Sequence, residues 1–385
     1  MSSENSSLSL SIAFTDELSP GIEYPISQCV PDPLAKTIRL DSSTLPDRVQ
    51  NETELGDLLT RPSPRLIETI KGFPKRLLIL GAGGKMGPTL AVLAKRASVL
   101  AGADLEVVAA SRFSDSRARQ WLESREIRTC ASDLLDRRSL ESLPDSTHII
   151  YLVGLKFGTT DNPALTWAAN TLVPAHVAER FPKARIIALS TGNVYPFVPV
   201  ESGGATEDHA LTPVGEYPNA AVARERIFDY FSRENGTQIA LIRLNYAVEL
   251  RYGVLLDIAR KVWAGQPVDL ATGCFNCIWQ GDANDLILRA FPLTSSPASS
   301  WNLTGPCLRV RDIALQFGEV LGRAPVFSGK ESNTALLSNT EKLCSHLGPP
   351  STPIDDIVRW TAHWVKSGGR CLDKPTHFEV RDGQY

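Results

Sequence analysis

A run of glycines between an apolar segment and a helical pattern constrains this chain more than any other feature of its sequence. Gly81-Ala-Gly83-Gly84-Lys-Met-Gly87 follows the strand-like run 76–80 and precedes the helical pattern 88–100. Glycines are required where a chain turns tightly, where its backbone approaches a ligand, and where a helix packs closely on a strand. The start of the following helix offers unpaired N–H groups and a positive dipole, which attract phosphate. The motif therefore predicts a strand–turn–helix unit that binds the diphosphate of a dinucleotide.

Further apolar runs alternate with amphipathic stretches along the chain, at 105–111, 147–154, 184–191 and 238–245. Short unbroken apolar runs separated by helices are typical of a parallel sheet covered on both faces. We therefore expect an α/β protein with a Rossmann doubly wound parallel sheet and a smaller C-terminal substrate-binding lobe. The expected organisation is a disordered extension (1–47), a short helical lead-in (48–74), the NAD(P)-binding domain (75–245) and a lobe (246–385) that also contributes to the sheet.

Composition excludes several classes of protein. The chain has 385 residues, of which 43% are hydrophobic, and a formal net charge of −3, so nothing favours nucleic acid or an anionic membrane as a partner. No apolar run approaches the ~20 residues that span a bilayer, and we expect a cytoplasmic protein.

The CxxC formed by Cys274 and Cys277 has no second pair nearby, so we interpret both as small buried hydrophobes and expect no metal site.

The residues after the second expected strand bear on which nicotinamide cofactor binds. A NAD-preferring site places an acidic residue there, to accept the ribose 2′-hydroxyl. This chain has Ser111 and Arg112 instead, and a hydroxyl with a guanidinium suits a 2′-phosphate. The sequence therefore favours NADP over NAD, with both left open. Asp133 and Leu134, after the next strand, are candidates to hold the adenine.

With these motifs in order, residues 76–325 resemble the extended short-chain dehydrogenase/reductases, in particular the NAD-dependent epimerase/dehydratases similar to UDP-galactose 4-epimerase. The glycine motif, Asp133, Val153-Gly154-Leu155-Lys156, Asn170 and the segment STGNVY (190–195) follow the family's order. The resemblance implies that Thr191 holds a substrate hydroxyl and that Tyr217 transfers a proton. The cofactor-binding residues expected from motif and resemblance together are Gly81, Gly83, Gly84, Lys85, Met86, Gly87, Ser111, Arg112, Asp133, Leu134, Val153, Gly154, Lys156, Asn170 and Tyr217.

One position departs from the family. Its active site reads Tyr-x-x-x-Lys, whereas this chain has Ala221 four residues after Tyr217. A free tyrosine has a pKa of about 10, roughly three units too high for a base at pH 7. The resemblance implies that the lysine ammonium beside the tyrosine favours its phenolate and so lowers the tyrosine pKa. Losing three units of that lowering would cost about 4 kcal/mol, roughly a thousandfold in rate. Arg224, one helical turn beyond Ala221, and Lys156 are the two candidates for a replacement cation.

Two functions of different classes remain. The first is an enzyme that uses NAD or NADP to epimerise, dehydrate or oxidise a sugar or nucleotide sugar, with Thr191, Tyr217 and Arg224 in its active site. The second is a catalytically impaired NAD(P)-binding sensor or scaffold, which the missing lysine favours. The expected partners are a small sugar-type substrate and, as the resemblance implies, a second copy of the chain in a homodimer.

Overall fold

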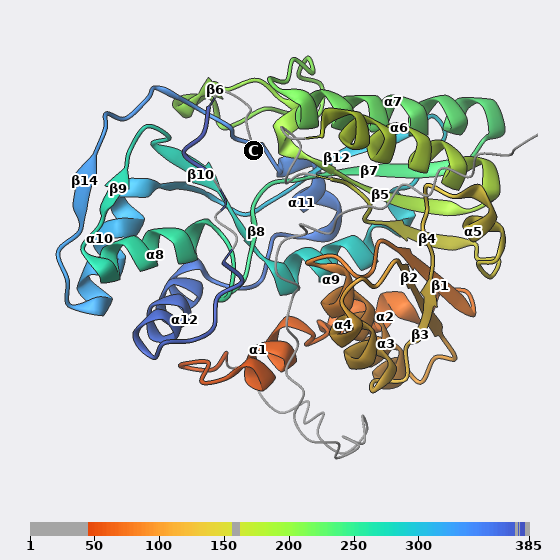
Figure 1. Ribbon diagram of the computed structural model, residues 1–385, viewed down its shortest axis with the longest axis horizontal. Coiled ribbons are helices and arrows are strands. Elements are labelled where there is room, and N and C mark those ends of the chain that lie inside the picture. Colours follow the sequence, from red (N-terminus) through yellow and green to blue (C-terminus); the bar gives the residue numbers. More distant parts are fainter. Residues whose placement is uncertain (1–44, 156–161, 374–375, 377, 382–385) are drawn as a thin grey trace, which may run out of the picture.

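The computed structural model of the protein describes residues 45–155, 162–373, 376 and 378–381, and a seven-stranded parallel sheet forms its centre (Figure 1). The strand order is β12-β7-β5-β4-β1-β2-β3, which places β1 near the middle of the sheet. The strands are β1 (Arg76–Leu80), β2 (Glu106–Ser111), β3 (Arg128–Ala131), β4 (His148–Tyr151), β5 (Arg185–Thr191), β7 (Gln238–Leu244) and β12 (Ser299–Leu303). The Rossmann sheet predicted from the sequence is confirmed, and its last strand, β12, comes from the C-terminal part of the chain.

Alternating side chains of β1 show how the sheet is covered on both faces. Leu77 and Ile79 belong to one buried cluster, and Leu78 and Leu80 to another, because successive strand residues point to opposite faces. Helices α2 (Pro64–Ile70), α3 (Gly87–Ala101), α4 (Ser116–Glu123), α9 (Gln280–Arg289) and α11 (Glu341–Leu347) supply residues to the first cluster. Helices α5 (Arg137–Glu141), α6 (Pro163–Arg180) and α7 (Glu216–Asn235) supply the second. All four β1 side chains are fully buried.

Besides the two clusters that cover the faces of the sheet, a separate hydrophobic core lies beside the sheet and defines the smaller lobe (Figure 1). It is built from α1 (Glu52–Leu59), α8 (Val254–Ala264), α10 (Val310–Leu321) and α12 (Ile354–Lys366). Four two-stranded sheets complete this part of the molecule, namely β10 (Cys274–Asn276) with β13 (Cys307–Arg309), β8 (Ala247–Val248) with β11 (Ile278–Trp279), β9 (Pro267–Asp269) with β14 (Val326–Ser328), and β6 (Val198–Pro199) with β15 (Thr334–Ala335). The two lead-in helices thus separate, because α1 packs into the lobe and α2 packs against the sheet.

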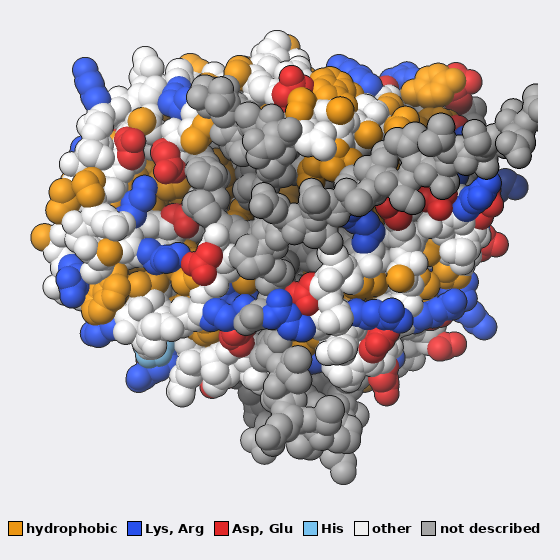
Figure 2. All heavy atoms as spheres, viewed as in Figure 1, with side chains coloured by type: hydrophobic (Ala, Val, Ile, Leu, Met, Phe, Trp, Pro, Cys, Tyr) orange, Lys and Arg blue, Asp and Glu red, His pale blue; other side chains and the backbone are white. Residues whose placement is uncertain are grey.

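The surface carries mixed charge. Figure 2 shows basic and acidic side chains interspersed on the face that it presents, with apolar side chains between them. Within the described ranges, no group of three or more His, Cys, Asp or Glu side chains is arranged to hold a metal ion. Of the helices in those ranges, none combines the length and the apolar character that crossing a membrane requires.

Candidate cofactor and substrate site

A cavity of about 250 Å³ lies at the carboxyl ends of β1, β4, β5 and β7. It is lined by Gly81, Gly84, Lys85, Met86, Gly87, Leu152, Leu189, Ser190, Thr191, Asn193, Tyr217, Leu244, Asn245, Tyr246, Ala247, Val248, Tyr252, Gly253 and Thr376. One wall is therefore the glycine loop, another is the end of β5 with the start of α7, and the third comes from the lobe. Ligands of open α/β sheets bind at this edge, outside the carboxyl ends of the strands.

The glycine loop has the geometry of a phosphate cradle. Gly81 has φ +80°, and a Cβ there would come within 3.1 Å of the backbone that follows β4. A Cβ at Gly87 would lie 2.5 Å from the Ala82 backbone, so only glycine lets α3 start this close to the loop. Helix α3 begins at Gly87 without a side-chain cap, which leaves its first N–H groups available to a ligand. The loop thus fits the diphosphate of a dinucleotide.

Replacing Gly87 with alanine is expected to weaken NAD(P) binding by at least about tenfold and to destabilise the protein by about 1–3 kcal/mol, because the new methyl group overlaps the Ala82 backbone. Isothermal titration and urea unfolding measure the two effects. The matched control is Gly56→Ala in α1, where the added Cβ meets no atom of another described segment within 4 Å and where alanine favours the helix. Unchanged affinity in Gly87→Ala would show that this close approach does not shape the binding site.

The residues expected at the adenosine end lie beside the loop, outside the cavity lining. A Cβ at Gly83 would meet Ser111 Oγ at 2.7 Å, so the loop packs directly on the end of β2. Arg112 is exposed just beyond, and it makes no hydrogen bond or ion pair with any residue in the described ranges. Asp133 is exposed and accepts a hydrogen bond from the Leu135 backbone N–H at 3.1 Å. Leu134 is buried in the core below the sheet.

Thr191 and Tyr217, the two residues expected to handle substrate, line the same cavity. Thr191 ends β5, and its hydroxyl donates to Asn193 Oδ1 at 3.2 Å. Tyr217 lies in the first turn of α7 and is 7% exposed. Burial raises the pKa of the nearby Tyr252 phenol, and Asp257 and Tyr217 raise it further. Thr191, Tyr217 and Tyr252 all carry a hydroxyl group and all line the cavity. These hydroxyl groups suit a polyhydroxylated substrate.

Ala221, which stands at the position of the family's lysine, is not among the described residues that line the cavity. Ala221 is fully buried in an apolar cluster with Val194, Val198 and Leu336, which belong to the loop after β5, to β6 and to the segment after β15. The lysine position is thus part of a hydrophobic contact between the sheet domain and a C-terminal segment.

Restoring the lysine with Ala221→Lys is expected to destabilise the protein by about 2–5 kcal/mol without increasing turnover, since an ammonium and four methylenes would enter a packed apolar cluster. Ala223→Lys, at a partly buried position on the same helix, is the matched control and is expected to cost less than about 1 kcal/mol. Urea unfolding compares the two variants. A stable, more active Ala221→Lys protein would mean that the cluster opens readily to the cofactor.

Arg224, one candidate for the replacement cation, is not among the described residues that line the cavity. Arg224 is 4% exposed, and its Nη1 donates to the Val153 carbonyl at 2.9 Å, beneath the segment that follows β4. A Cβ at Gly154 would lie 2.6 Å from the same Nη1 and 3.8 Å from Asn170 Oδ1. Asn170 is itself fully buried, and its Nδ2 donates to the Thr166 carbonyl at 2.8 Å. Lys156 lies outside the described residues.

Lys85 is the one charged side chain among the described residues that line the cavity. From the glycine loop it reaches the lobe, where its Nζ donates to the Ala247 carbonyl at 2.7 Å and lies 3.6 Å from the centre of the Tyr252 ring. The sequence motif places Lys85 in the cofactor loop, but nothing local indicates that its ammonium contacts β8 and the residues after it.

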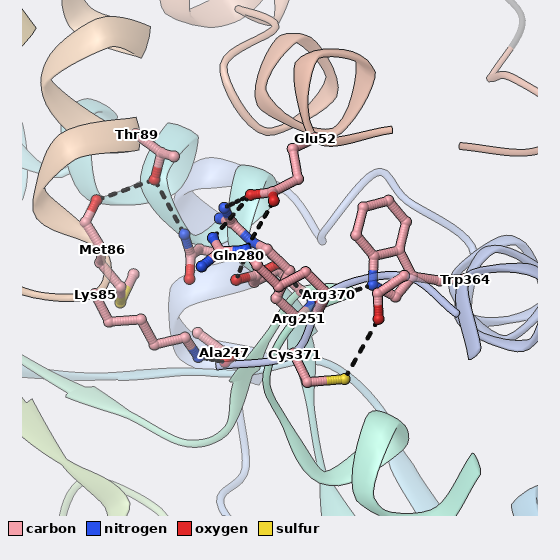
Figure 3. A network of polar contacts seen from close by, with 12 residues as sticks. Glu52, Lys85, Met86, Thr89, Ala247, Arg251, Gln280, Trp364, Arg370 and Cys371 are labelled. Atoms are coloured by element: carbon pink, nitrogen blue, oxygen red, sulfur yellow. Dashed lines mark hydrogen bonds and ion pairs between the residues drawn. The ribbon is translucent and has the colours of Figure 1, made fainter. Parts of the chain in front are cut away.

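The lobe segment 246–253 is held by a network of ion pairs (Figure 3). Arg251, with a side chain 6% exposed, pairs with Glu249 at 3.1 Å and with Glu52 of α1 at 2.9 Å. Arg370, after α12, also pairs with Glu52, at 2.7 Å. Burial raises the pKa of the Glu52 carboxyl, but hydrogen bonds and charges from both arginines outweigh burial and hold it below its usual value. Helix α1 and the C-terminal segment therefore fix a wall of the cavity.

A buried ion pair supports the opposite wall. Arg243 of β7 and Glu225 of α7 are joined at 2.7 Å, with side chains 5% and 4% exposed. Ser190 Oγ donates to the same carboxylate from the cavity lining. Arg243 also donates to the Tyr195 hydroxyl at 2.7 Å, and burial raises the pKa of Tyr195 to about 12 although the neighbouring guanidinium opposes it. This pair ties the residue next to Thr191 to α7, which carries Tyr217.

Several lining residues could not be named from the sequence. Asn193, Asn245, Tyr246, Tyr252 and Thr376 reach the cavity from loops whose paths depend on the packing of the lobe. A hint exists only for Asn193, which lies within the STGNVY segment.

Comparison with known proteins finds one family model that matches the part of the chain containing this site. The NAD dependent epimerase/dehydratase family matches residues 77–253, which contain the glycine loop, Thr191 and Tyr217. No curated protein sequence matches the chain.

Solved structures share the fold at low sequence identity. The UDP-glucose 4-epimerase of Thermus thermophilus, in complex with NAD, superposes with a TM-score of 0.61 and 20% identity over 76% of this chain and 99% of that one. The UDP-glucuronic acid 4-epimerase of Bacillus cereus, in complex with NAD, gives 0.64 and 17% over 76% and 98%. An epimerase of Methanothermobacter thermautotrophicus gives 0.62 and 18% over 80% and 97%. The family resemblance found in the sequence is confirmed over residues 77–253, the part of the chain that matches the NAD dependent epimerase/dehydratase family.

Proposed function

We propose that this protein is an NAD(P)-dependent enzyme that acts on a sugar or nucleotide sugar by hydride transfer, as an epimerase, a dehydratase or an oxidoreductase. One observation carries the proposal: a single cavity brings the glycine loop 81–87 together with Thr191 and Tyr217. Two of the similar structures are 4-epimerases in complex with NAD.

In this proposal, different residues of the chain bind the cofactor and the substrate. The glycine loop and the start of α3 hold the cofactor diphosphate through backbone N–H groups, and a bound nicotinamide supplies the hydride acceptor. Thr191 orients a substrate hydroxyl by hydrogen bonding, as do the amides of Asn193 and Asn245, which line the same cavity. The largely buried lining limits the access of water to the reacting carbon.

Tyr217 is the proton carrier in this proposal. Its phenolate accepts the proton of the substrate hydroxyl as hydride leaves that carbon for the nicotinamide, and the phenol so formed returns a proton when the carbon is reduced. Thr191, which lines the same cavity, keeps the substrate oxygen within reach of Tyr217.

Arg112 selects the cofactor in this proposal. The guanidinium is exposed at the end of β2 and has no partner in the described part of the chain, which suits a bidentate contact to a 2′-phosphate. The test is to purify the protein without added cofactor, denature it and identify any released nucleotide by mass spectrometry. Titration with NAD and NADP then follows, and we expect tighter binding of NADP and a loss of that preference in Arg112→Ala. Tightly retained NAD would contradict the preference and indicate an enzyme that recycles its cofactor in place.

The buried Ala221 favours a second candidate, an NAD(P)-binding sensor or scaffold without turnover. The position of the family's lysine is filled by apolar packing, as expected if selection for catalysis had been lost. Turnover on a panel of sugars, sugar acids and nucleotide sugars separates the two functions. Stoichiometric NAD(P) binding with no turnover on that panel would favour the sensor.

A homodimer through α6 and α7 also belongs to the proposal. Trp167 and Leu172 of α6 and Tyr230 of α7 are large apolar side chains that are 38%, 50% and 57% exposed, and a second copy would cover them. Light scattering coupled to gel filtration measures the mass in solution, and a monomer would contradict this part.

A further inference from the structure

Tyr252 places a second phenol in the cavity that contains Tyr217. Both side chains line the cavity, Tyr217 from the start of α7 and Tyr252 from the turn that precedes α8. Backbone hydrogen bonds in both directions between Glu249 and Tyr252, at 3.0 and 3.2 Å, close this turn. The Lys85 ammonium lies 3.6 Å from the centre of the Tyr252 ring. Contacts of its backbone and of its ring therefore both hold Tyr252 in place.

The hydroxyl of Tyr252 is available as a hydrogen-bond donor. It makes no hydrogen bond with any residue in the described ranges. Burial raises the pKa of this phenol, and the nearby Asp257 and Tyr217 raise it further, so it keeps its proton at neutral pH. Within the described ranges, Lys85, Asp257 and Tyr217 are the titratable groups that act on Tyr252. A phenol that stays neutral can donate to an anion without competing with it to ionise.

The anion that the proposed reaction requires in this cavity is the phenolate of Tyr217. Ala221 replaces the family's lysine, and Arg224 is not among the described residues that line the cavity. A hydrogen bond to an ionised acceptor is shorter and roughly twice as strong as one between neutral groups. Electrostatic coupling between two titratable groups is mutual, so a Tyr252 that keeps its proton leaves Tyr217 as the member of the pair that ionises.

We propose that Tyr252 is a positioning residue for proton transfer, which donates a hydrogen bond to the Tyr217 phenolate and so supplies part of the stabilisation that the family's lysine provides. This inference rests on the proposed function and assigns the replacement of the lysine to a neutral donor. Tyr252 keeps its own proton throughout, and Tyr217 alone exchanges a proton with the substrate.

A double-mutant cycle tests whether Tyr252 acts through Tyr217. Tyr252→Phe removes only the hydroxyl, and we expect it to lower kcat by at least about tenfold with the Kd of the cofactor within about twofold of the wild type. The double variant Tyr217→Phe/Tyr252→Phe should be no slower than Tyr217→Phe alone, because its acceptor phenolate is already gone. Tyr230→Phe removes an exposed hydroxyl near the end of α7 and should keep wild-type kcat.

The ionisation of Tyr217 is measured without substrate, from the ultraviolet absorbance of its phenolate as the pH is raised. Its signal is the difference between the wild type and Tyr217→Phe, and, without the Tyr252 hydroxyl, the difference between Tyr252→Phe and the double variant. We expect Tyr252→Phe to move the midpoint of this signal upward by about one pH unit, a tenfold loss of phenolate at neutral pH. Tyr230→Phe should leave the midpoint unchanged, and circular dichroism confirms that each variant is folded over the titration.

Two outcomes would overturn the proposal. An unchanged midpoint in Tyr252→Phe would show that the Tyr252 hydroxyl does not stabilise the Tyr217 phenolate. If the losses of kcat in the two single variants multiply in the double variant, Tyr252 acts independently of Tyr217. Failure of the proposed function is seen separately, as a wild type without NAD(P) binding or without turnover. The absorbance titration needs neither substrate nor cofactor, so it then decides the role of Tyr252 by itself.

Discussion

Tyr217→Phe is expected to lower kcat by about a thousandfold and to leave the Kd of the cofactor within about twofold of the wild type. Proton transfer by a positioned side chain contributes roughly 10²–10⁴-fold to the rate, and this variant removes only the hydroxyl that carries the proton. The ring stays in its buried position at the start of α7, so the cavity keeps its shape. Steady-state kinetics on a substrate found in the panel, with calorimetric titration of NAD(P), measure the two effects.

The matched control for this prediction lies on the same helix. Tyr230, 57% exposed near the end of α7, is outside the cavity lining, and Tyr230→Phe should keep wild-type kinetics. A Tyr217→Phe enzyme with more than about a tenth of wild-type kcat would exclude Tyr217 as the proton carrier. Tyr252, whose hydroxyl-bearing ring lines the same cavity, would then be the next residue to substitute.

Glu225→Gln is expected to reduce the free energy of unfolding by about 3–5 kcal/mol, because it leaves the guanidinium of Arg243 buried without a carboxylate. The side chains of this pair are 4% and 5% exposed, so water cannot replace the lost charge. The variant also weakens the acceptor of Ser190, which lies beside Thr191, so we expect kcat to fall as well. Urea unfolding followed by circular dichroism measures the change in stability.

Two comparisons make this result specific. Asp229→Asn breaks an ion pair with Arg233 on the surface of the same helix, and it should cost less than about 1 kcal/mol because solvent screens exposed charges. The double variant Glu225→Met/Arg243→Met removes both buried charges and should recover part of the stability lost in the single variant. Equal losses in Glu225→Gln and Asp229→Asn would show that the buried pair contributes no more than a surface pair.

The sequence by itself determined the features that depend on neighbouring residues. An unbroken apolar run such as 77–80 is typical of a strand buried on both faces. Gly81 has a positive φ that favours glycine, and Gly87 starts α3 too close to the Ala82 backbone for a side chain. Both follow from backbone sterics and from the alternation of strand side chains. For that reason the Rossmann sheet and the resemblance to the epimerase/dehydratase family were predictable from the printed chain, and the order of the motifs was enough to single out Thr191 and Tyr217 as candidates.

Only the tertiary structure decided what long-range packing controls. It placed Ala221 in an apolar cluster with Leu336, directed Arg224 to the Val153 carbonyl, and brought the Lys85 ammonium across to the lobe. It also joined Glu52 to Arg251 and Arg370, residues 199 and 318 positions away in the chain. The reason is physical: a side chain's partner is set by which elements meet after folding, and a buried charge is stable only where the fold supplies its counter-charge. Because these contacts join residues that are far apart in the chain, local sequence patterns do not predict them.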